Sequence, residues 1–240
     1  MKKELEITYD TLSLQGGREI NEDYLGCCKN HVFVLCDGLG GHGSGEVASK
    51  FVVEQILSCY EEQGLSMEES IQYAQDALLK KQEEENAKNS MKTTVTCLEI
   101  LDGRAKFAHV GDSRVYLFEN AKYKLRSLDH SIPQLLVQRG MIKEKDIRYH
   151  EDRSRLLCAM GTEWSAPKYQ VIDQIEVNQG TTFLLCSDGF WELIDEKKMS
   201  STLKKSKSPS EWLTAMEKII LENGEGTNMD NYSAIAVFIR

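Results

Sequence analysis

The order of short apolar segments along the chain is the feature that most restricts its fold. Alternating or continuous apolar runs typical of strands occur at 5–9, 24–28, 31–36, 93–101, 105–110, 114–119, 123–128, 169–177, 181–187 and 232–239. Apolar residues at helical spacing occur only at 48–59, 67–78, 131–140, 195–203 and 210–223. A parallel sheet would need a helix after almost every strand. We therefore predict an α+β fold with two antiparallel sheets and helices packed outside them.

Two helix starts carry recognisable local signals, and one long segment carries none. Ser66 and Glu69 form a capping-box pattern before the helix at 67–78, and Pro133 falls in the first turn of the helix at 131–140. The stretch at about 142–165 is polar and has little periodicity, so we expect a long surface excursion there. No linker divides the chain, and we expect residues 1–240 to form a single domain.

The charge balance and the cysteines restrict the class of protein. With 29 Lys and Arg against 38 Asp and Glu, the net charge is -9, which argues against a nucleic-acid binder. Phosphate chemistry remains open, because metal ions can carry the positive charge. No apolar run is long enough for a signal peptide or a membrane span. Seven cysteines without a Cys-x-x-Cys pair indicate a reducing, cytoplasmic compartment and no structural zinc.

Four aspartates stand at the ends of predicted strands. Asp37 follows an apolar run and opens the glycine-rich loop at 38–45. Asp112 and Asp188 also follow apolar runs and lie beside glycines, and Asp230 comes just before the last strand. One such residue would be a simple turn. Four suggest one shared acidic site, and clustered carboxylates suit magnesium or manganese better than zinc.

A second polar group lies upstream, at 16–23. Arg18 could grip two oxygens of a phosphate, and Glu22 and Asp23 could orient metal-bound waters. The alternative for Arg18 is a surface ion pair, which is the more common role of a lone arginine near carboxylates.

The ordered set of motifs resembles the metal-dependent protein serine/threonine phosphatases of the phosphatase 2C family, in their compact bacterial form. The matching motifs span nearly the whole chain from about Thr8. They are Arg18-x-x-Asn21-Glu22-Asp23, Asp37-Gly-Leu-Gly-Gly-His42, Thr93-Thr94, Gly111-Asp-Ser-Arg114, Asp129-His-Ser131, Ser187-Asp-Gly189 and Asp230-Asn231.

This resemblance implies a fold, a cofactor and a set of site residues. The implied fold is a four-layer α/β/β/α sandwich, and the implied cofactor is two Mn²⁺ or Mg²⁺ ions with a possible third. Asp37 would bridge two ions, with the carbonyl of Gly38 on one and Asp188 and Asp230 on the other. Glu22 and Asp23 would hold metal-bound waters, Arg18 the substrate phosphate, and Asp112 a third, weaker ion. The 142–165 stretch would be the flap beside the site.

Three positions depart from the family pattern. Leu39 stands where some eukaryotic relatives have a histidine proposed as general acid, so the acid is left open between a metal-bound water and a histidine such as His42. We expect His42 to pack the loop, and His109 and His130 to be structural. Lys92 replaces a usual glycine, where a small local backbone change is expected. Leu157-Cys158 replaces a frequent Thr-Arg pair in the flap, which would alter substrate grip.

The resemblance implies phosphorylated proteins as substrates, including a serine/threonine kinase or its targets, with no nucleic-acid or membrane partner and a monomeric state. Two rivals remain. One is a metal-dependent nuclease or small-molecule phosphatase, which shares the acidic cluster. The other is a non-catalytic pseudophosphatase that binds phosphoproteins; loss of a metal aspartate would mark it, and none is missing here.

Overall fold

The computed structural model describes residues 5–29, 31–40, 44–88 and 90–240. The strands are β1 (Ile7–Leu14), β2 (Asp23–Cys28), β3 (Val32–Leu39), β4 (Lys92–Thr93), β5 (Val95–Leu101), β6 (Arg104–Val110), β7 (Arg114–Glu119), β8 (Lys122–Arg126), β9 (Gln170–Glu176), β10 (Thr181–Cys186) and β11 (Tyr232–Ile239). The helices are α1 (Ser44–Ser58), α2 (Met67–Glu84), α3 (Ile132–Gln138), α4 (Asp188–Trp191), α5 (Glu196–Leu203) and α6 (Pro209–Gly224), with short helical turns η2 (Cys59–Gln63) and η3 (Glu144–Tyr149).

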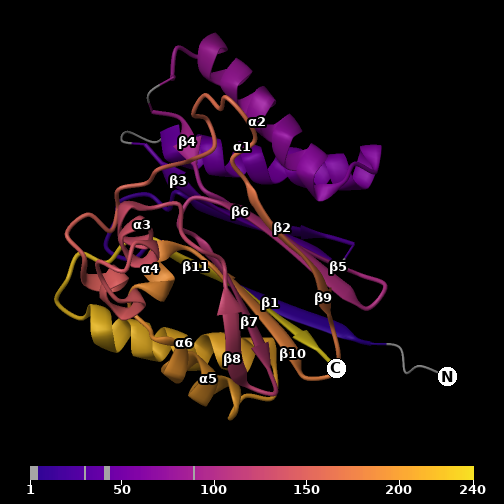
Figure 1. The fold of residues 1–240 in the computed structure, drawn as a ribbon, viewed down its shortest axis with the longest axis vertical. Coiled ribbons are helices and arrows are strands. Elements are labelled where there is room, and N and C mark those ends of the chain that lie inside the picture. The colour runs from indigo at the N-terminus through magenta and orange to yellow at the C-terminus, as the bar shows by residue number, and fades with distance from the viewer. Residues whose placement is uncertain (1–4, 30, 41–43, 89) are drawn as a thin grey trace.

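The strands form two antiparallel sheets that lie against each other. One sheet has the order β1-β11-β10-β7-β8, and the other has the order β2-β3-β5-β6-β9 with β4 paired to β3. In Figure 1, α1 and α2 cover one outer face and α5 and α6 cover the other. The predicted four-layer α/β/β/α sandwich is therefore confirmed.

Residues 32–36 of β3 are all apolar because both faces of the strand are buried. Val32, Val34 and Cys36 belong to the core under α1 and α2, whereas Phe33 and Leu35 belong to the core between the sheets. Successive side chains of a strand point to opposite faces. A strand covered on both faces is therefore mainly apolar and does not alternate, and every position of β10 and β11 in the other sheet is likewise buried.

The local signals that the sequence contains are realised in the structure. Ser66 caps α2 with the complete capping box to Glu69. Pro133 lies in the first turn of α3, which Ser131 caps. All seven cysteines are free of disulfides. Among the helices of the described residues, none is both long and apolar enough to span a membrane.

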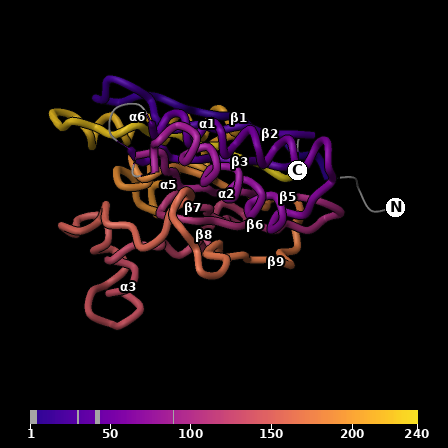
Figure 2. The backbone as a smooth tube through the Cα atoms, turned by 90° about the horizontal axis from the view of Figure 1, so that it is seen from above, coloured from indigo at the N-terminus to yellow at the C-terminus, as the bar shows by residue number. Residues whose placement is uncertain are grey.

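Several boundaries differ from the sequence-based ones. β1 begins later and continues to Leu14, because it pairs along its whole length with β11. The predicted strand at 93–101 is divided at Thr94 into β4 and β5. The turn of the hairpin between β2 and β3 includes residue 30, which lies outside the described residues. The stretch from α3 onward projects from one end of the two-sheet body (Figure 2), and it contains η3, which the sequence did not indicate.

Candidate active site

A pocket of about 600 Å³ lies where the ends of the two sheets meet. Its walls include all four strand-end aspartates, Asp37, Asp112, Asp188 and Asp230. The first and the last of them are 193 positions apart in the sequence. The remaining lining residues are Arg18, Glu19, Ile20, Glu22, Gly38, Leu39, Gly40, Ser154, Leu156 and Asn231. The predicted convergence of the strand ends is therefore observed, and Asp23 is the one predicted residue that does not line the pocket.

Asp37 is held at the end of β3 by its backbone. Its carbonyl oxygen accepts a hydrogen bond from Thr94 N at 2.8 Å and another from Thr93 Oγ1 at 2.8 Å. Its N–H donates to Thr94 Oγ1 at 2.9 Å. The side chain is thereby left free to face the pocket. The two threonines, which the sequence marked only as a motif, position the central carboxylate.

Gly38 is required by close backbone approach. A Cβ at this position would meet the carbonyl oxygen of Glu22 at 2.7 Å, well inside van der Waals contact. The Gly38 N–H donates to that same carbonyl at 3.1 Å, and Ser49 Oγ of α1 donates to it at 2.6 Å. Any side chain at 38 would therefore separate β3 from the Glu22 segment and open the pocket.

Asp188 and Asp230 come from the other sheet. Asp188 begins α4 directly after β10, and Asp230 lies two residues before β11. The end of β10 is adjacent to the start of β11, as the pairing of Cys186 with Ala234 shows. Antiparallel pairing thus brings the two aspartates together although 42 positions of sequence separate them.

Asn231 anchors the loop that carries Arg18. Its Nδ2 donates to the carbonyl oxygens of Gln15 at 2.8 Å and Ile20 at 2.9 Å. Its Oδ1 accepts from Glu22 N at 2.8 Å. Asn231 belongs to the Asp230-Asn231 motif, but the sequence assigns it no role, because an amide beside a strand-end aspartate does not reveal its partners.

Arg18 lies at the rim of the pocket and pairs with Asp230. The Nη2–Oδ2 distance is 2.7 Å, and the two side chains are 49% and 43% exposed. The two alternatives for Arg18 were a phosphate-binding residue and a surface ion pair. In the structure its guanidinium forms an ion pair and also lines the pocket.

Asp23 is buried behind the pocket. It pairs with Asp37 across β2 and β3, and its Oδ2 accepts from Ser187 Oγ at 2.7 Å. Ser187 Oγ in turn accepts from Ser233 N at 2.9 Å. The second carboxylate oxygen of Asp23, Oδ1, is buried without a hydrogen-bond partner among the described residues. Such an oxygen calls for a cation or an ordered water.

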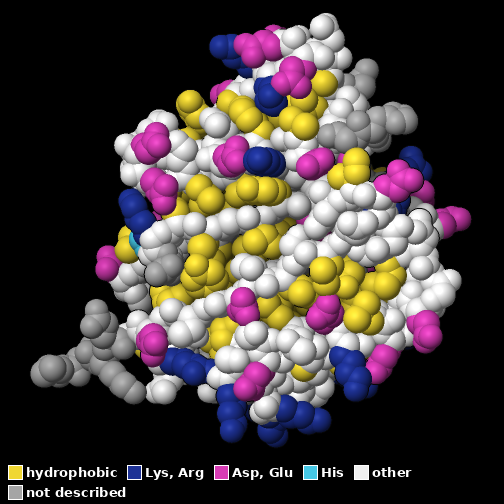
Figure 3. Space-filling view, turned by 180° about the vertical axis from the view of Figure 1, so that it is seen from behind, with side chains coloured by type: hydrophobic (Ala, Val, Ile, Leu, Met, Phe, Trp, Pro, Cys, Tyr) yellow, Lys and Arg dark blue, Asp and Glu magenta, His cyan; other side chains and the backbone are white. Residues whose placement is uncertain are grey.

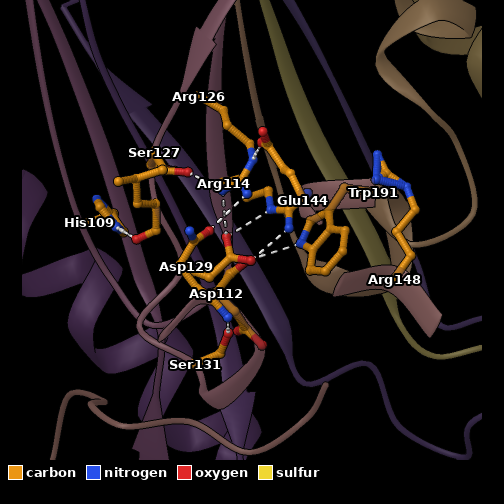
Figure 4. Close-up of polar contacts among 12 residues, drawn as sticks. His109, Asp112, Arg114, Arg126, Ser127, Asp129, Ser131, Glu144, Arg148 and Trp191 are labelled. Atoms are coloured by element: carbon orange, nitrogen blue, oxygen red, sulfur yellow. Dashed lines mark hydrogen bonds and ion pairs between the residues drawn. The ribbon is translucent and has the colours of Figure 1, made fainter. Parts of the chain in front are cut away.

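Asp112 is buried and is fixed by a network that Figure 4 shows. Trp191 Nε1 donates to the carbonyl oxygen of Asp112 at 2.9 Å. The Arg114 guanidinium stacks on the Trp191 ring, 3.3 Å from its centroid. Arg114 also binds Asp129 with both ends of its fork, at 2.8 and 2.6 Å. Asp112 therefore sits on a rigid support that connects two motifs, Gly111-Asp-Ser-Arg114 and Asp129-His-Ser131.

The carboxylates of the site disfavour one another's charge. Burial, followed by the charge of Asp188, raises the pKa of both Asp37 and Asp112 well above the usual aspartate range. Burial and the charge of Asp230 raise the pKa of Asp188. Burial also raises the pKa of Asp23 to about 7. A positive charge placed among these groups would relieve the repulsion and restore their ionisation.

The donor set fits hydrated divalent cations. Among the described residues, no three His, Cys, Asp or Glu side chains are gathered tightly enough to form a preassembled cage. Mg²⁺ keeps several waters and binds through one or two carboxylates, so a cage is not needed. The oxygen-only donors of the pocket and the unpartnered Asp23 Oδ1 match this mode of binding.

The flap supplies one wall of the pocket through Ser154 and Leu156. Arg153 Nε lies 3.1 Å from Glu192 Oε2, and Arg148 Nη2 lies 2.8 Å from Glu196 Oε1. Glu192 and Glu196 come shortly after Asp188 in the chain, so the two ion pairs hold the 142–165 stretch close to Asp188.

Leu157 and Cys158, which replace the frequent Thr-Arg pair, line a neighbouring cavity of about 300 Å³ and not the pocket itself.

The lysine and the histidines singled out from the sequence lie outside the pocket wall or outside the described residues. Lys92 pairs with Leu39 in regular antiparallel geometry within β4. His109 and His130 stack on each other, with ring centroids 4.7 Å apart, in packing roles. His42 lies outside the described residues. Among the described residues, no histidine lines the pocket.

Comparison with known proteins agrees with this geometry. The protein phosphatase 2C family model matches residues 15–220. The serine/threonine phosphatase stp of Listeria welshimeri is 33% identical over 208 residues, which is 81% of each chain. The structure of Stp1 from Staphylococcus aureus has a TM-score of 0.86 at 26% identity, over 98% of this chain and 96% of that one. The catalytic domain of PstP, solved with 2 manganese ions, has a TM-score of 0.83 at 23% identity, over 98% and 99%.

The sandwich of two antiparallel sheets is shared with the phosphatase structures, and the acidic pocket lies at its end. The family match extends over most of the chain, and the Listeria relative exceeds 30% identity over four fifths of it. The chain belongs to the protein phosphatase 2C family. The predicted class of enzyme, a metal-dependent protein serine/threonine phosphatase, is thereby confirmed.

Proposed function

We propose that this pocket hydrolyses phosphoserine and phosphothreonine in phosphorylated proteins. The observation that carries the proposal is the meeting of one arginine and four aspartates around a single space that two sheets enclose. An arginine can grip two phosphate oxygens, and aspartates supply the hard oxygen ligands of Mn²⁺ or Mg²⁺. The relatives named as serine/threonine phosphatases support the same substrate class.

The metal ligands come from both sheets. Asp37 would hold both ions, the Gly38 carbonyl would bind one of them, and Asp188 and Asp230 would complete the other. Glu22 and Asp23 would act through metal-bound waters. When bound, such a pair of ions would supply an activated water as nucleophile and would offset charge on the phosphate.

Asp112 would hold a third, weaker ion. Few other protein carboxylates remain to ligate an ion at this side of the pocket, and its backbone is fixed by Trp191. Arg114 stacks on Trp191, so the contact that holds the Asp112 backbone is itself buttressed.

Arg18 binds the phosphate. Its guanidinium is half-exposed at the rim, where a phosphate enters, and in the absence of substrate its charge is balanced by Asp230. With Asp230 engaged by a cation, the guanidinium could donate hydrogen bonds to two phosphoryl oxygens. Leu39, whose side chain cannot donate a proton, lines the pocket. The leaving oxygen therefore takes its proton from a metal-bound water or from a histidine such as His42.

The setting of the enzyme follows from the same residues. Residues 1–240 act as one catalytic domain, as a monomer in the cytoplasm. The seven unbridged cysteines support a reducing compartment. The physiological substrates are a serine/threonine kinase or its targets.

The decisive experiment is phosphate release from a phosphothreonine peptide in the presence of Mn²⁺. The wild-type protein is expected to turn over and to lose activity in EDTA. Asp188→Asn should abolish turnover, and Arg18→Ala should raise KM while binding of Mn²⁺ persists. Asp173→Asn is the matched control, since Asp173 lies on β9, away from the pocket. Full turnover in Asp188→Asn would exclude the assignment.

A further inference from the structure

A cluster of lysines lies at the far side of the molecule from α1 and α2. Residues 197–207 contain five of them, Lys197, Lys198, Lys204, Lys205 and Lys207, with no acidic residue between. All five side chains are exposed. Their ammonium groups form no ion pair with any described residue, whereas Lys50, Lys80 and Lys81 on α1 and α2 each pair with a glutamate. Figure 3 shows Lys and Arg gathered along the lower edge, where α5 lies in Figure 1.

Two of these lysines line a groove of about 510 Å³ between α5 and the β7–β8 hairpin. The α5 side is formed by Lys197, Ser200, Ser201 and Lys204, and the opposite side by residues 120–123. Positions i, i+3, i+4 and i+7 occupy one face of a helix. The stripe therefore places the two serines in the middle and a lysine at each end, with the two lysine backbone positions about 10 Å apart along the axis.

The hairpin side completes a surface for an anionic ligand with some apolar character. Lys122 contributes a third ammonium group, and Ala121 and the half-buried Tyr123 contribute apolar contacts. Glu196 is the single acidic lining residue, and its carboxylate is already engaged by Arg148 of the flap at 2.8 Å. The free charge of the groove is therefore positive.

The charge of the groove is opposite to that of the chain as a whole. The protein carries a net charge of -9, so an acidic partner is repelled by most of its surface. Unpaired lysines in one concave strip attract such a partner at one place and in one orientation.

We propose that this groove binds an extended acidic segment of a partner protein. In an extended chain of the polyproline II type, residues three apart lie on the same side and about 9 Å from each other, which is close to the separation of positions 197 and 204 along α5. A single small anion could reach only one end of the stripe. The groove shares no lining residue with the acidic pocket, so it is a second binding surface and does not depend on the proposed catalytic roles.

The test uses a fluorescently labelled ten-residue glutamate peptide and its glutamine counterpart, both without phosphate, and measures anisotropy with the full-length protein. The acidic peptide should bind, the glutamine peptide should not, and affinity should fall as salt rises. Lys197→Gln/Lys204→Gln should weaken binding about tenfold, since two exposed charge pairs are lost. Lys50→Gln/Lys80→Gln removes two charges on α1 and α2 and should leave binding unchanged.

Hydrolysis of p-nitrophenyl phosphate, measured in parallel, verifies that all variants are folded and active. No binding of the acidic peptide, or equal loss in both double variants, would overturn the proposal. So would groove-dependent binding of phosphatidylserine vesicles or single-stranded RNA in place of the peptide, since the groove would then serve a membrane or a nucleic acid.

Discussion

His109 shows how one buried side chain can make the stability of this protein depend on pH. Its Nε2–H donates to the carbonyl oxygen of Leu128 at 2.7 Å, and its Nδ1 is buried without a hydrogen-bond partner among the described residues. The ring also stacks on His130. Burial, together with the neighbouring His130, lowers the pKa of His109 to about 4. The folded state therefore holds this ring neutral.

We expect His109→Gln to reduce the loss of stability in mild acid. In the unfolded chain a histidine takes up its proton near pH 6.5, whereas in the folded protein it does so near pH 4. The unfolded state binds more protons in this window, so stability falls as the pH drops through it. Between pH 7 and pH 5 the wild type should lose about 2 kcal/mol more than the variant, measured by urea unfolding.

The change of stability with pH is the informative quantity, because His109→Gln can also alter packing by a constant amount. His31→Gln is the matched control. His31 directly precedes β3, and its side chain bonds the nearby carbonyl of Lys29. Parallel pH profiles for wild type and His109→Gln would show that His109 is not the cause.

At the residue scale, the sequence predicts the charged members of the site and misses their supports. Asp37, Asp112 and Asp188 can be recognised in the sequence because each follows an apolar run and lies beside a glycine. Asn231 and Ser187 act through contacts with Glu22 and Asp23, more than 160 positions away in the chain. No local pattern encodes such partners, because the packing of one sheet against the other creates them.

At the scale of elements, Asp129 lies at the centre of a buried polar network that connects β7, β8, α3 and η3. Its carboxylate binds Arg114 of β7 and Arg126 of β8, and all three side chains are 1% exposed. Arg126 also bonds Gln134 of α3 at 2.8 Å and Glu144 of η3 at 2.9 Å. Although burial acts to raise it, the two guanidinium groups hold the pKa of Asp129 below its ordinary value.

We expect Asp129→Asn to destabilise the fold by about 3–5 kcal/mol, because it leaves two guanidinium groups buried without a counter-charge. Chemical unfolding at pH 7 measures this loss. Asp152→Asn removes an aspartate paired with the exposed Arg155 and should change stability by less than about 1 kcal/mol. Equal effects of the two substitutions would mean that the buried network contributes little.

The sequence predicts a helix or strand well where a local pattern of apolar or capping residues marks it. It predicts the ends of an element less well where pairing with a distant strand sets them. The capping box of α2 and the apolar run of β3 are local, and the structure contains both. The extent of β1 depends on the length of β11, and the division at Thr94 depends on its bonds to Asp37. η3 is fixed by the contact of Glu144 with Arg126, which the sequence of the 142–165 stretch does not reveal.

At the scale of the whole molecule, the acidic pocket is a seam between the two sheets. Asp37 belongs to the sheet of β3, and Asp188 and Asp230 belong to the ends of β10 and β11. Between the sheets the contacts are apolar, through residues such as Phe33, Leu35 and Phe183. At the seam, by contrast, carboxylates of both sheets face each other, and their repulsion opposes closure.

We therefore expect Mn²⁺ to stabilise the entire fold against heat. A ligand present at 100 times its dissociation constant stabilises the folded state by about 2.7 kcal/mol, which corresponds to a rise in Tm of about 5–10 °C for a protein of this size. Asp37→Asn removes the carboxylate shared by both ions and should abolish most of this rise. In EDTA the same variant should be at least as stable as the wild type, because one of the repelling charges is gone. Asp173→Asn on β9 should behave as the wild type does in both conditions. Scanning calorimetry with and without Mn²⁺ measures the difference, and an undiminished rise in Asp37→Asn would show that ions bind elsewhere than at the seam.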